Sequence, residues 1–364
     1  MGLKIGIVGL PNVGKSTIFN AVTKAGAQVA NYPFCTIDPN IGVVPVPDER
    51  LQKLSEMYQP EKTTPTTVEF VDIAGLVKGA STGEGLGNQF LGHIKEVDAT
   101  LHVVRCFEDA DVVHVSGNVD PIRDIEVVQT ELCLKDLETV NQRMRKLEKT
   151  AKGGDKDAKV AIAVCEKALK LLEAGKPVRK SDWSREEFPF LRELQLITSK
   201  PVLYAANVKE SELPSGGPLV EPVKKMAQEE GSEIVVICGQ VEAEVAELGD
   251  EEAKEYLREF GLTESGLNQL IRKSYQLLGL ITYLTAGEKE VRAWTVLNGS
   301  TAPQAAGIIH SDFERGFIRA EVMKYGDLVR LGSQQAVKEK GLYRLEGKEY
   351  IVQDGDIIYF RFNV

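Results

Sequence analysis

The sequence predicts an α/β fold built on a mostly parallel sheet, and three observations lead to this prediction. Short apolar runs rich in β-branched residues recur between residues 3 and 238. Segments with helical spacing lie between several of them, an alternation typical of βαβ units. The first run leads directly into a glycine-rich turn and then into a helical segment. We therefore expect a sheet whose strands are connected mainly through helices.

The expected strands of this sheet follow in chain order. They are the segments 3–8, 41–46, 67–71, 100–104, 202–206 and 234–238, each a short apolar run with β-branched residues. A helix is expected over residues 15–25, directly after the first strand and its glycine turn.

Residues 125–172 interrupt this rhythm, because they carry almost no strand signal. The turn sequence Gly153-Gly154-Asp155 divides them into two helical segments. We expect an antiparallel helical hairpin with a narrow apolar seam and polar outer faces, projecting as an arm. The seam residues recur at near-helical spacing in the first helix: Leu132, Leu134, Leu137, Val140, Met144 and Leu147.

After about Gly279 the chain changes again, to short strands, turns and one expected helix. Asp354-Gly355 lies between the apolar runs 350–352 and 357–360, which predicts a β-hairpin. The predicted domains are an α/β domain of residues 1–124 and 199–280, an inserted helical arm of residues 125–198, and a small domain of residues 281–364.

Composition excludes several classes of protein. With 43% hydrophobic and 27% charged residues, the 364-residue chain is neither disordered nor collagenous. No window approaches the roughly 20 apolar residues that span a bilayer, and residues 1–6 do not form a signal peptide. Five scattered cysteines without a CxxC pair predict reduced thiols, no disulfide and no zinc site. We expect a cytoplasmic protein with no membrane partner.

The charge is unevenly distributed along the chain. Residues 131–180 hold 13 Lys and Arg against 8 Asp and Glu, a net charge of +5, whereas the rest of the chain carries −15. A basic surface of this kind favours contacts with RNA phosphates, and the alternative is a solvated charged helix. The candidate RNA-binding residues surround the hairpin tip: Arg143, Arg145, Lys146, Lys149 and Lys152.

Residues 9–16, GLPNVGKS, fit the pattern G-x-x-x-x-G-K-[ST] at every fixed position. The match follows a predicted strand and opens a predicted helix, which is the context that the motif requires. Backbone N–H groups of such a loop surround phosphate oxygens. Lys15 neutralises the β- and γ-phosphates and is therefore also a catalytic candidate, and the Ser16 hydroxyl binds Mg²⁺. The predicted nucleotide-binding residues here are Asn12, Val13, Gly14, Lys15, Ser16 and Thr17.

Three further residues are candidates for contacts around the γ-phosphate. Asp72, at the end of a predicted strand, can reach the metal through water, and Gly75 can offer its N–H to the γ-phosphate. Thr36 lies in a loop where a threonine can close over Mg²⁺, although it can equally cap a turn. Six glycines between residues 75 and 92 suit a loop that orders with the phosphate state or a plain surface loop.

Asn207, Val208 and Glu210 follow another predicted strand, at the place where GTP-binding domains carry N-K-x-D. Glutamate is one methylene longer than aspartate, so the bidentate guanine contact is misplaced. A site built for guanine rejects adenine because buried polar groups remain unpaired. Without that contact we predict binding of ATP, and GTP is the alternative.

Leu76 occupies the place of the glutamine that orients the attacking water in Ras-like enzymes. Hydrolysis is then slow, or another group supplies this function. His114, in a polar loop, is the catalytic candidate, and Asn12 is a candidate for holding K⁺ near the phosphates. The alternatives are a solvent-facing histidine and a loop asparagine that makes hydrogen bonds.

These motifs together resemble the YchF family of Obg-like ATPases, in the Obg-related branch of P-loop GTPase-like proteins. The resemblance runs along the whole chain and rests on GLPNVGKS, NYPFCTIDPN (31–40), DIAGLVKGA (72–80), GLGNQFL (85–91), the acidic loop with His114, and N-x-x-E. It implies a Ras-like nucleotide domain, an inserted coiled-coil arm and a C-terminal TGS domain, which is a ubiquitin-like β-grasp module.

The resemblance also implies preference for ATP over GTP, with adenine held by Asn207 and by backbone near Val208. It places Leu76 in the family's hydrophobic replacement of the catalytic glutamine and His114 in the alternative catalytic role. It implies association with ribosomes through the basic arm and the TGS domain.

Three functional hypotheses follow. The first is a monomeric, ribosome-associated, Mg²⁺-dependent ATPase that hydrolyses ATP slowly and acts as a conformational switch in translation or stress regulation. The second is a regulatory GTPase whose N-x-x-E sequence still selects guanine. The third is a scaffold in which nucleotide only stabilises the fold and a protein partner binds.

Overall fold

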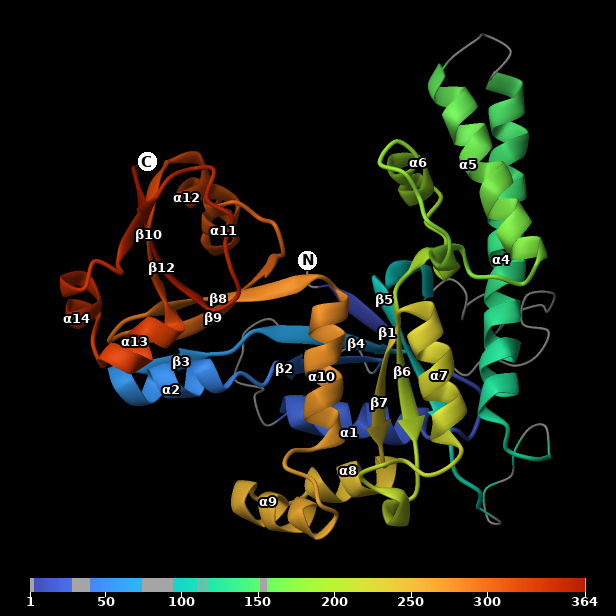
Figure 1. Ribbon diagram of the computed structural model, residues 1–364, viewed down its shortest axis with the longest axis horizontal. Helices are drawn as coiled ribbons and strands as arrows, with labels where there is room; N and C mark the ends of the chain where they lie inside the picture. The colour runs from blue at the N-terminus through green and yellow to red at the C-terminus, as the bar shows by residue number, and fades with distance from the viewer. Residues whose placement is uncertain are drawn as a thin grey trace. The chain divides into compact units, whose positions relative to one another are not determined.

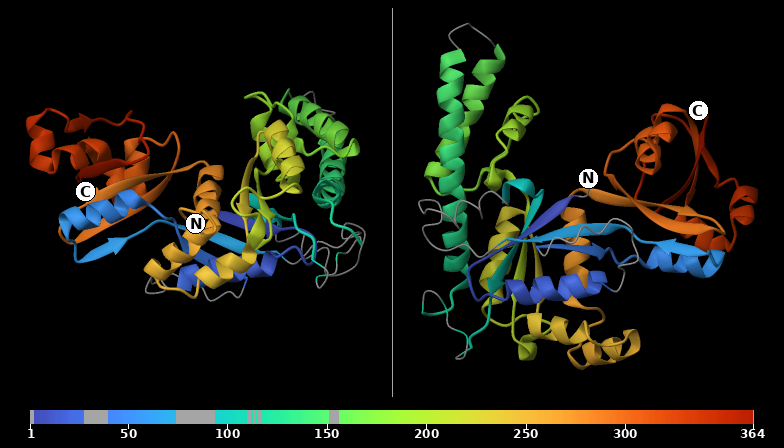
Figure 2. Two further views of the ribbon diagram at one scale, coloured as in Figure 1. Left: turned by 60° about the horizontal axis from the view of Figure 1, so that its bottom comes forward. Right: turned by 180° about the vertical axis from the view of Figure 1, so that it is seen from behind.

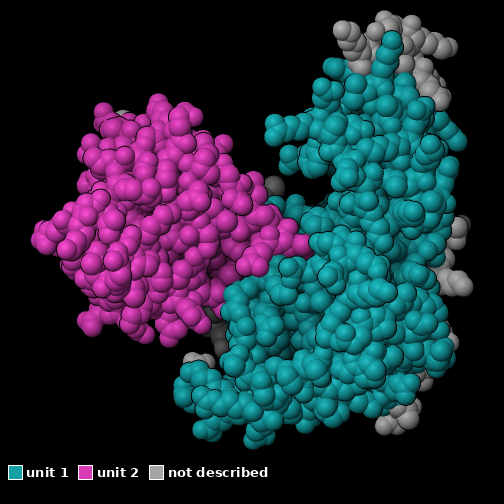
Figure 3. Space-filling model, viewed as in Figure 1, with its two compact units in different colours: residues 1–44, 69–274 teal, residues 45–68, 275–364 magenta. Residues whose placement is uncertain are grey.

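The structure is a computed structural model, and it describes residues 3–27, 40–73, 94–109, 112, 114, 117–150 and 156–363. The chain divides into two compact units, coloured separately in Figure 3. Unit 1 comprises residues 1–44 and 69–274, and unit 2 comprises residues 45–68 and 275–364.

Residues 45–68 therefore belong to unit 2, and not to the α/β domain in which they were predicted. The physical reason is twofold. Residues 62–64 pair with residues 290–292 in the second sheet, and Leu51 and Leu54 are buried in an apolar cluster of unit 2. The local sequence of a short strand does not indicate that it pairs with a strand more than 200 residues away.

Unit 1 is built around a six-stranded sheet with the order β2-β4-β1-β5-β6-β7 (Figure 1). The pairs β1–β4, β1–β5, β5–β6 and β6–β7 are all parallel. This confirms the predicted mostly parallel α/β fold. The strands are β1 (Lys4–Val8), β2 (Ile41–Pro45), β4 (Thr67–Asp72), β5 (Ala99–Arg105), β6 (Val202–Asn207) and β7 (Glu233–Ile237).

Helices cover this sheet and position its C-terminal edge. Every residue of the central strands β5 and β6 is buried, as expected for strands covered on both faces. Helix α7 packs against β6 and β7, and α1 packs against α8. The described helical elements on the α/β sheet, outside the arm, are α1 (Lys15–Ala27), η4 (Glu210–Glu212), α7 (Val220–Glu230), α8 (Gly239–Val245), α9 (Asp250–Glu259) and α10 (Gly266–Leu277).

The predicted helical hairpin is present within unit 1. Helices α4 (Pro121–Thr150) and α5 (Lys156–Glu173) lie side by side in both views of Figure 2 and in contact. Helix α4 begins four residues before the predicted start, and its first turns pack into the α/β core through Ile125. Leu134 was expected in the seam, but it is 41% exposed.

The chain returns from the arm through short helical turns that close the seam. These are η2 (Val178–Lys180), α6 (Phe188–Glu193) and η3 (Ile197–Ser199). Asp136 of α4 is fully buried and accepts hydrogen bonds from the backbone N–H groups of Ile197 (2.9 Å) and Thr198 (2.7 Å). This carboxylate ties the returning segment to the middle of α4.

Unit 2 is a mixed sheet with the order β11-β10-β12-β8-β9-β3. The hairpin β8–β9 is antiparallel, β12 pairs with β8 in parallel and with β10 in antiparallel orientation, and α11 contacts β9 and β10. This is the expected β-grasp architecture. The elements are α2 (Glu49–Tyr58), β3 (Lys62–Thr64), β8 (Leu280–Ala286), β9 (Glu290–Leu297), α11 (Ala302–Ile309), α12 (Ser311–Arg315), β10 (Phe317–Lys324), α13 (Tyr325–Leu331), α14 (Gln334–Glu339), β11 (Arg344–Glu346) and β12 (Asp356–Phe362).

Two expectations for this region are wrong. Residues 281–364 hold four helices rather than one. Asp354-Gly355 also does not join a hairpin, because both edges of β12 pair with other strands, β10 and β8. Ile351 instead forms an isolated bridge with Thr301. In the described part of the chain, no helix has the length and apolar character needed to cross a membrane.

Candidate nucleotide-binding site

The loop between β1 and α1 has a backbone shape that depends on its glycines. Gly9, Asn12 and Gly14 all have positive φ angles, of 152°, 61° and 97°. A Cβ atom on Gly9 would lie 2.5 Å from the Val103 carbonyl oxygen, and one on Gly14 would lie 2.3 Å from Asn207 Nδ2. A side chain at Gly9 would collide with the β5 backbone, and one at Gly14 would displace the Asn207 amide, so both positions require glycine. The fixed glycines of the motif are therefore explained by packing on β5 and β6.

Lys15 opens helix α1 and points back across this loop. Its ammonium group donates a hydrogen bond to the Leu10 carbonyl oxygen at 2.7 Å, and the side chain is buried. Burial lowers the pKa of Lys15 to about 8, and the Asp72 carboxylate partly opposes this effect. A buried ammonium group with so little compensating charge is well placed to receive phosphate oxygens.

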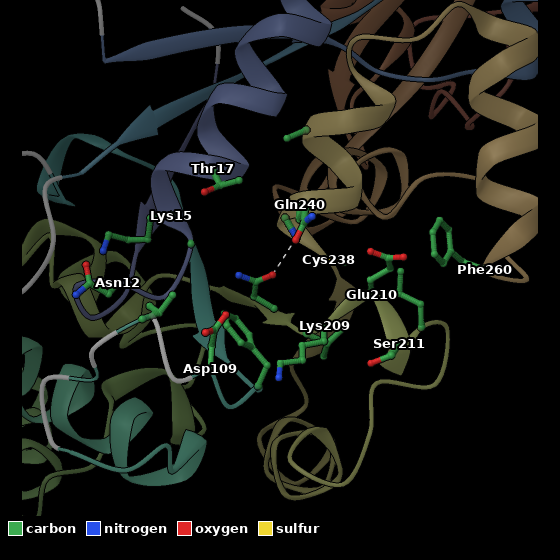
Figure 4. Close-up of a pocket in the computed structure, with 18 of the residues that line it drawn as sticks. Asn12, Lys15, Thr17, Asp109, Lys209, Glu210, Ser211, Cys238, Gln240 and Phe260 are labelled. Atoms are coloured by element: carbon green, nitrogen blue, oxygen red, sulfur yellow. Dashed lines mark hydrogen bonds between the residues drawn. The ribbon is translucent and has the colours of Figure 1, made fainter.

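Asn207, at the end of β6, fastens the phosphate loop to the start of α8. Its Nδ2 donates to the Val13 carbonyl oxygen at 2.9 Å, and its Oδ1 accepts from the Gly239 N–H at 3.0 Å, the dashed line in Figure 4. A side-chain amide has two N–H groups and two lone pairs. After these two bonds, the Asn207 amide can still donate one hydrogen bond and accept one.

These elements surround a cavity of about 1160 Å³ within unit 1. Figure 4 shows its lining converging from several elements, with Lys15 and Thr17 on α1 and Glu210 and Ser211 on η4. Of the predicted nucleotide-binding residues that are described, all except Val13 line this cavity: Asn12, Gly14, Lys15, Ser16, Thr17, Asn207, Val208 and Glu210. Val13 is buried behind the loop and contributes the carbonyl group that Asn207 binds.

Four groups of lining residues were not predicted from the sequence. Phe107, Asp109 and Val112 follow β5; Cys238, Gly239, Gln240 and Ala243 lie in α8 or directly before it; Lys209, Ser211 and Leu213 lie next to the predicted Glu210; Glu259 and Phe260 end α9. The first two groups directly follow predicted strands. Because binding sites of parallel sheets form beyond the carboxyl ends of the strands, this position was the signal that pointed to them. Phe260 carries no comparable signal.

Val208, the second residue of the predicted base-binding sequence N-x-x-E, is positioned by a backbone hydrogen bond. The Val208 N–H donates to the Ile237 carbonyl oxygen at 2.9 Å, and its side chain is buried at the cavity wall. Glu210 begins η4, is exposed, and lies across the cavity from Lys15 (Figure 4).

Two of the predicted metal-binding residues, each with a side-chain oxygen, lie close to Lys15. The Ser16 side chain is exposed on the first turn of α1, and Asp72 ends β4. Register places Asp72 opposite Ile7, so β4 ends beside the strand that enters the phosphate loop. Burial raises the pKa of Asp72, and Lys15 acts in the opposite direction. Thr36 and Gly75 lie outside the described residues, as does Leu76.

No three His, Cys, Asp or Glu side chains gather into a metal cage in the ranges that the structure describes. A hydroxyl and one carboxylate fit Mg²⁺, which keeps several waters and takes oxygens from substrate phosphates.

His114 does not line the cavity. It is buried rather than facing solvent, and its Nε2 pairs with Asp124 Oδ2 at 2.8 Å. Asp124 lies in the first turn of α4 and also accepts from Arg123 at 3.1 Å. Val112, two residues before His114, lines the cavity.

The basic candidates on the arm are only partly described. Arg145 and Lys146 are exposed, whereas Arg143 is partly buried and pairs with Glu193 at 3.1 Å. Lys152 and the Lys149 side chain lie outside the described part of the structure.

The parallel sheet, the glycine-dependent loop and the lysine at the start of α1 define a P-loop protein with a GTPase-like domain. A family model described as "50S ribosome-binding GTPase" matches residues 4–167. The model of the YchF GTPase C-terminal region, described as "Protein of unknown function (DUF933)", matches residues 280–363.

Full-length relatives identify the family within this class. Proteins of Bacillus subtilis and Escherichia coli O157:H7, both named "Ribosome-binding ATPase YchF", are 58% and 57% identical to this chain over 100% of both sequences. The structure of the Schizosaccharomyces pombe YchF GTPase matches with a TM-score of 0.89 and 43% identity, covering 99% of this chain and 98% of that one. The chain belongs to the YchF family.

Proposed function

We propose that this protein is a ribosome-associated ATPase that binds and slowly hydrolyses ATP with Mg²⁺ and acts as a switch in translation or stress regulation. The observation that carries the proposal is the phosphate loop, locked by Asn207 to the start of α8 around one cavity. The names of the full-length relatives support both the ATPase activity and the ribosome as partner. The proposal includes a cytoplasmic, monomeric protein with three parts, in which the arm and the TGS domain contact the ribosome.

The chain's own residues account for phosphate binding. N–H groups of the loop and the N-terminus of α1 bind phosphate oxygens. Lys15 exchanges the Leu10 carbonyl oxygen for the β- and γ-phosphates and then neutralises charge that develops as the γ-phosphoryl group departs. Ser16, Thr36 and, through water, Asp72 would hold Mg²⁺. The bound ion would neutralise charge on the β- and γ-phosphates, and the Gly75 N–H contacts the γ-phosphate.

Base recognition rests on Asn207, Val208 and Glu210. Asn207 keeps one donor and one acceptor for adenine beyond its two protein bonds, and Val208 contributes a wall. Glu210 lies on the exposed side of the cavity, where its longer side chain misplaces the carboxylate for guanine.

His114 is proposed to orient the attacking water, because Leu76 cannot. Its ring must leave Asp124 to do so, since the pair holds it away from the cavity lining. A rearrangement before each turnover is consistent with slow hydrolysis. Asn12, beside Lys15 in Figure 4, is proposed to hold K⁺; equal rates in K⁺ and Na⁺ would remove this part of the proposal.

The first experiment compares equilibrium binding of ATP and GTP, with Mg²⁺, to the wild type and to Lys15→Ala. We expect tighter ATP binding and its loss in Lys15→Ala. Lys24→Ala is the matched control, because Lys24 is an exposed lysine in the last turn of the same helix. Unchanged ATP affinity in Lys15→Ala refutes the phosphate-loop assignment, and tighter GTP binding favours a regulatory GTPase.

Ribosome binding is tested by co-sedimentation at increasing salt. Arg145→Glu with Lys146→Glu should weaken it, because lost phosphate contacts reduce a salt-dependent affinity. Lys225→Glu with Arg258→Glu makes the same charge change on exposed residues of α7 and α9. Equal loss in both pairs would argue against the arm. ATP turnover at background with Mg²⁺, K⁺ and ribosomes present favours the scaffold hypothesis.

A further inference from the structure

Arg105 is an arginine in an unusual place. It ends the central strand β5, is 1% exposed, and is one of the largest fully buried side chains among the described residues. In the register of the sheet it stands opposite Asn207, the residue that fastens the phosphate loop. Transfer of a charged side chain from water into a protein interior is costly unless it is paired and hydrogen-bonded. A buried guanidinium beside the nucleotide cavity therefore requires an explanation.

Its partners are backbone carbonyl groups rather than carboxylates. Nε donates to the Phe107 carbonyl oxygen at 3.1 Å, Nη1 to that of Val112 at 3.0 Å, and Nη2 to that of Asp109 at 3.3 Å. The guanidinium carbon also lies 4.7 Å from the centre of the Phe107 ring. Among the described residues, no Asp or Glu forms an ion pair with Arg105.

Each of these carbonyl groups belongs to a residue that lines the nucleotide cavity. Phe107, Asp109 and Val112 are three of its wall residues, and they reach it from one loop that lacks a helix or strand among its described residues. A loop held only by its ends does not present a fixed wall. The planar guanidinium offers five donors in a rigid fork, and here three of its nitrogens hold three points of the same loop.

We infer that Arg105 is a positioning residue for nucleotide binding: it holds Phe107, Asp109 and Val112 as one wall of the cavity. This rests on the proposed function, since it concerns the wall of the same site. Arg105 does not line the cavity itself, so its effect on the nucleotide passes through the loop. Its charge also serves affinity indirectly, because charge-assisted hydrogen bonds are stronger than neutral ones.

The test is Arg105→Lys, which keeps the charge and loses the fork. Three different nitrogens of Arg105 bind the three carbonyl groups, whereas lysine has a single nitrogen on a shorter side chain. We therefore expect Arg105→Lys to lose at least one of these bonds and the Kd for ADP to rise about tenfold, the effect of losing one such bond. In steady state the KM for ATP should rise by a similar factor, with kcat within about twofold of wild type. Arg105→Ala should bind more weakly still and regain ADP affinity when ethylguanidinium is added.

Arg179→Lys is the matched control. Arg179 is a largely buried arginine of unit 1, 3.6 Å from Glu230, and it does not line the nucleotide cavity. Its Lys variant should lower the melting temperature without changing the Kd for ADP. Wild-type ADP affinity in Arg105→Lys overturns the inference, and so does an equal rise in Kd in Arg179→Lys or the absence of rescue by ethylguanidinium.

Lys15→Ala, measured in parallel, distinguishes failure of the positioning role of Arg105 from failure of the nucleotide site. If Lys15→Ala loses ADP and Arg105→Lys does not, only the positioning role of Arg105 is wrong. If ADP affinity survives in both variants, the nucleotide site itself is wrong, and the role of Arg105 is wrong with it.

Discussion

Replacing Asn207 by alanine removes two buried hydrogen bonds at once. The Val13 carbonyl oxygen loses its donor at 2.9 Å, and the Gly239 N–H loses its acceptor at 3.0 Å. Both groups belong to buried residues. A buried polar group left without a partner costs about 1–3 kcal/mol, so the two together predict a loss of about 4 kcal/mol. This is a large fraction of the roughly 5–15 kcal/mol by which domains are stable.

The measurement is urea unfolding without nucleotide, followed by tryptophan fluorescence. The chain has two tryptophans, Trp183 in unit 1 and Trp294 in unit 2. A Trp294→Phe background makes the signal report unit 1, which matters because a chain of two units need not unfold in one step. The exposed Asn141→Ala on α4 is the control, with an expected change within about 0.5 kcal/mol.

Asn207→Asp separates the two bonds. It retains an acceptor for the Gly239 N–H but places a carboxylate oxygen opposite the Val13 carbonyl oxygen. It should therefore destabilise unit 1 while keeping the start of α8 in place. A loss below about 1 kcal/mol for Asn207→Ala, with an unchanged m-value, would refute the reasoning, because both orphaned groups must then have found other partners.

Four further predictions concern Lys15, Glu210 and His114. Because phosphates favour the charged form of Lys15, whose pKa without nucleotide is lowered to about 8 by burial, the affinity for ADP should fall as pH rises above 8, and in Lys15→Arg this pH dependence should disappear; a pH-independent wild type contradicts it. For stability without nucleotide the sign is opposite: the folded state releases this proton at lower pH than the unfolded state, so unit 1 gains stability as pH rises from about 8 to 10.5. Glu210→Asp should move the ratio of GTP to ATP affinity toward GTP in competition binding, with Glu212→Asp on the same turn as control; an unchanged ratio removes Glu210 from base selection. His114→Ala should slow ATP turnover with little change in ATP affinity while Asp124→Asn, which weakens the same pair but keeps the imidazole, retains turnover; wild-type turnover in His114→Ala leaves His114 with a structural role only.

The sequence by itself determined the sheet and the phosphate loop. Gly9 and Gly14 were assigned correctly to a loop between a strand and a helix, and Lys15 to the start of that helix, because their spacing is local and a local pattern fixes a local backbone shape. The arm was predicted for the same reason, since helical periodicity and a turn signal lie within one segment. These features need no knowledge of which distant residues pack together.

Only the tertiary structure decided what lies around that loop. Asn207 bonds to Val13 across 194 residues of sequence, and three carbonyl groups converge on Arg105 from a loop without a pattern of its own. His114 was predicted as a catalytic residue, yet it pairs with Asp124 in the interior and does not line the cavity. Residues 45–68 join unit 2 through a strand pairing that no nearby residue specifies. In each case the partner is chosen by packing and by the need to satisfy buried polar groups, and both depend on the whole fold.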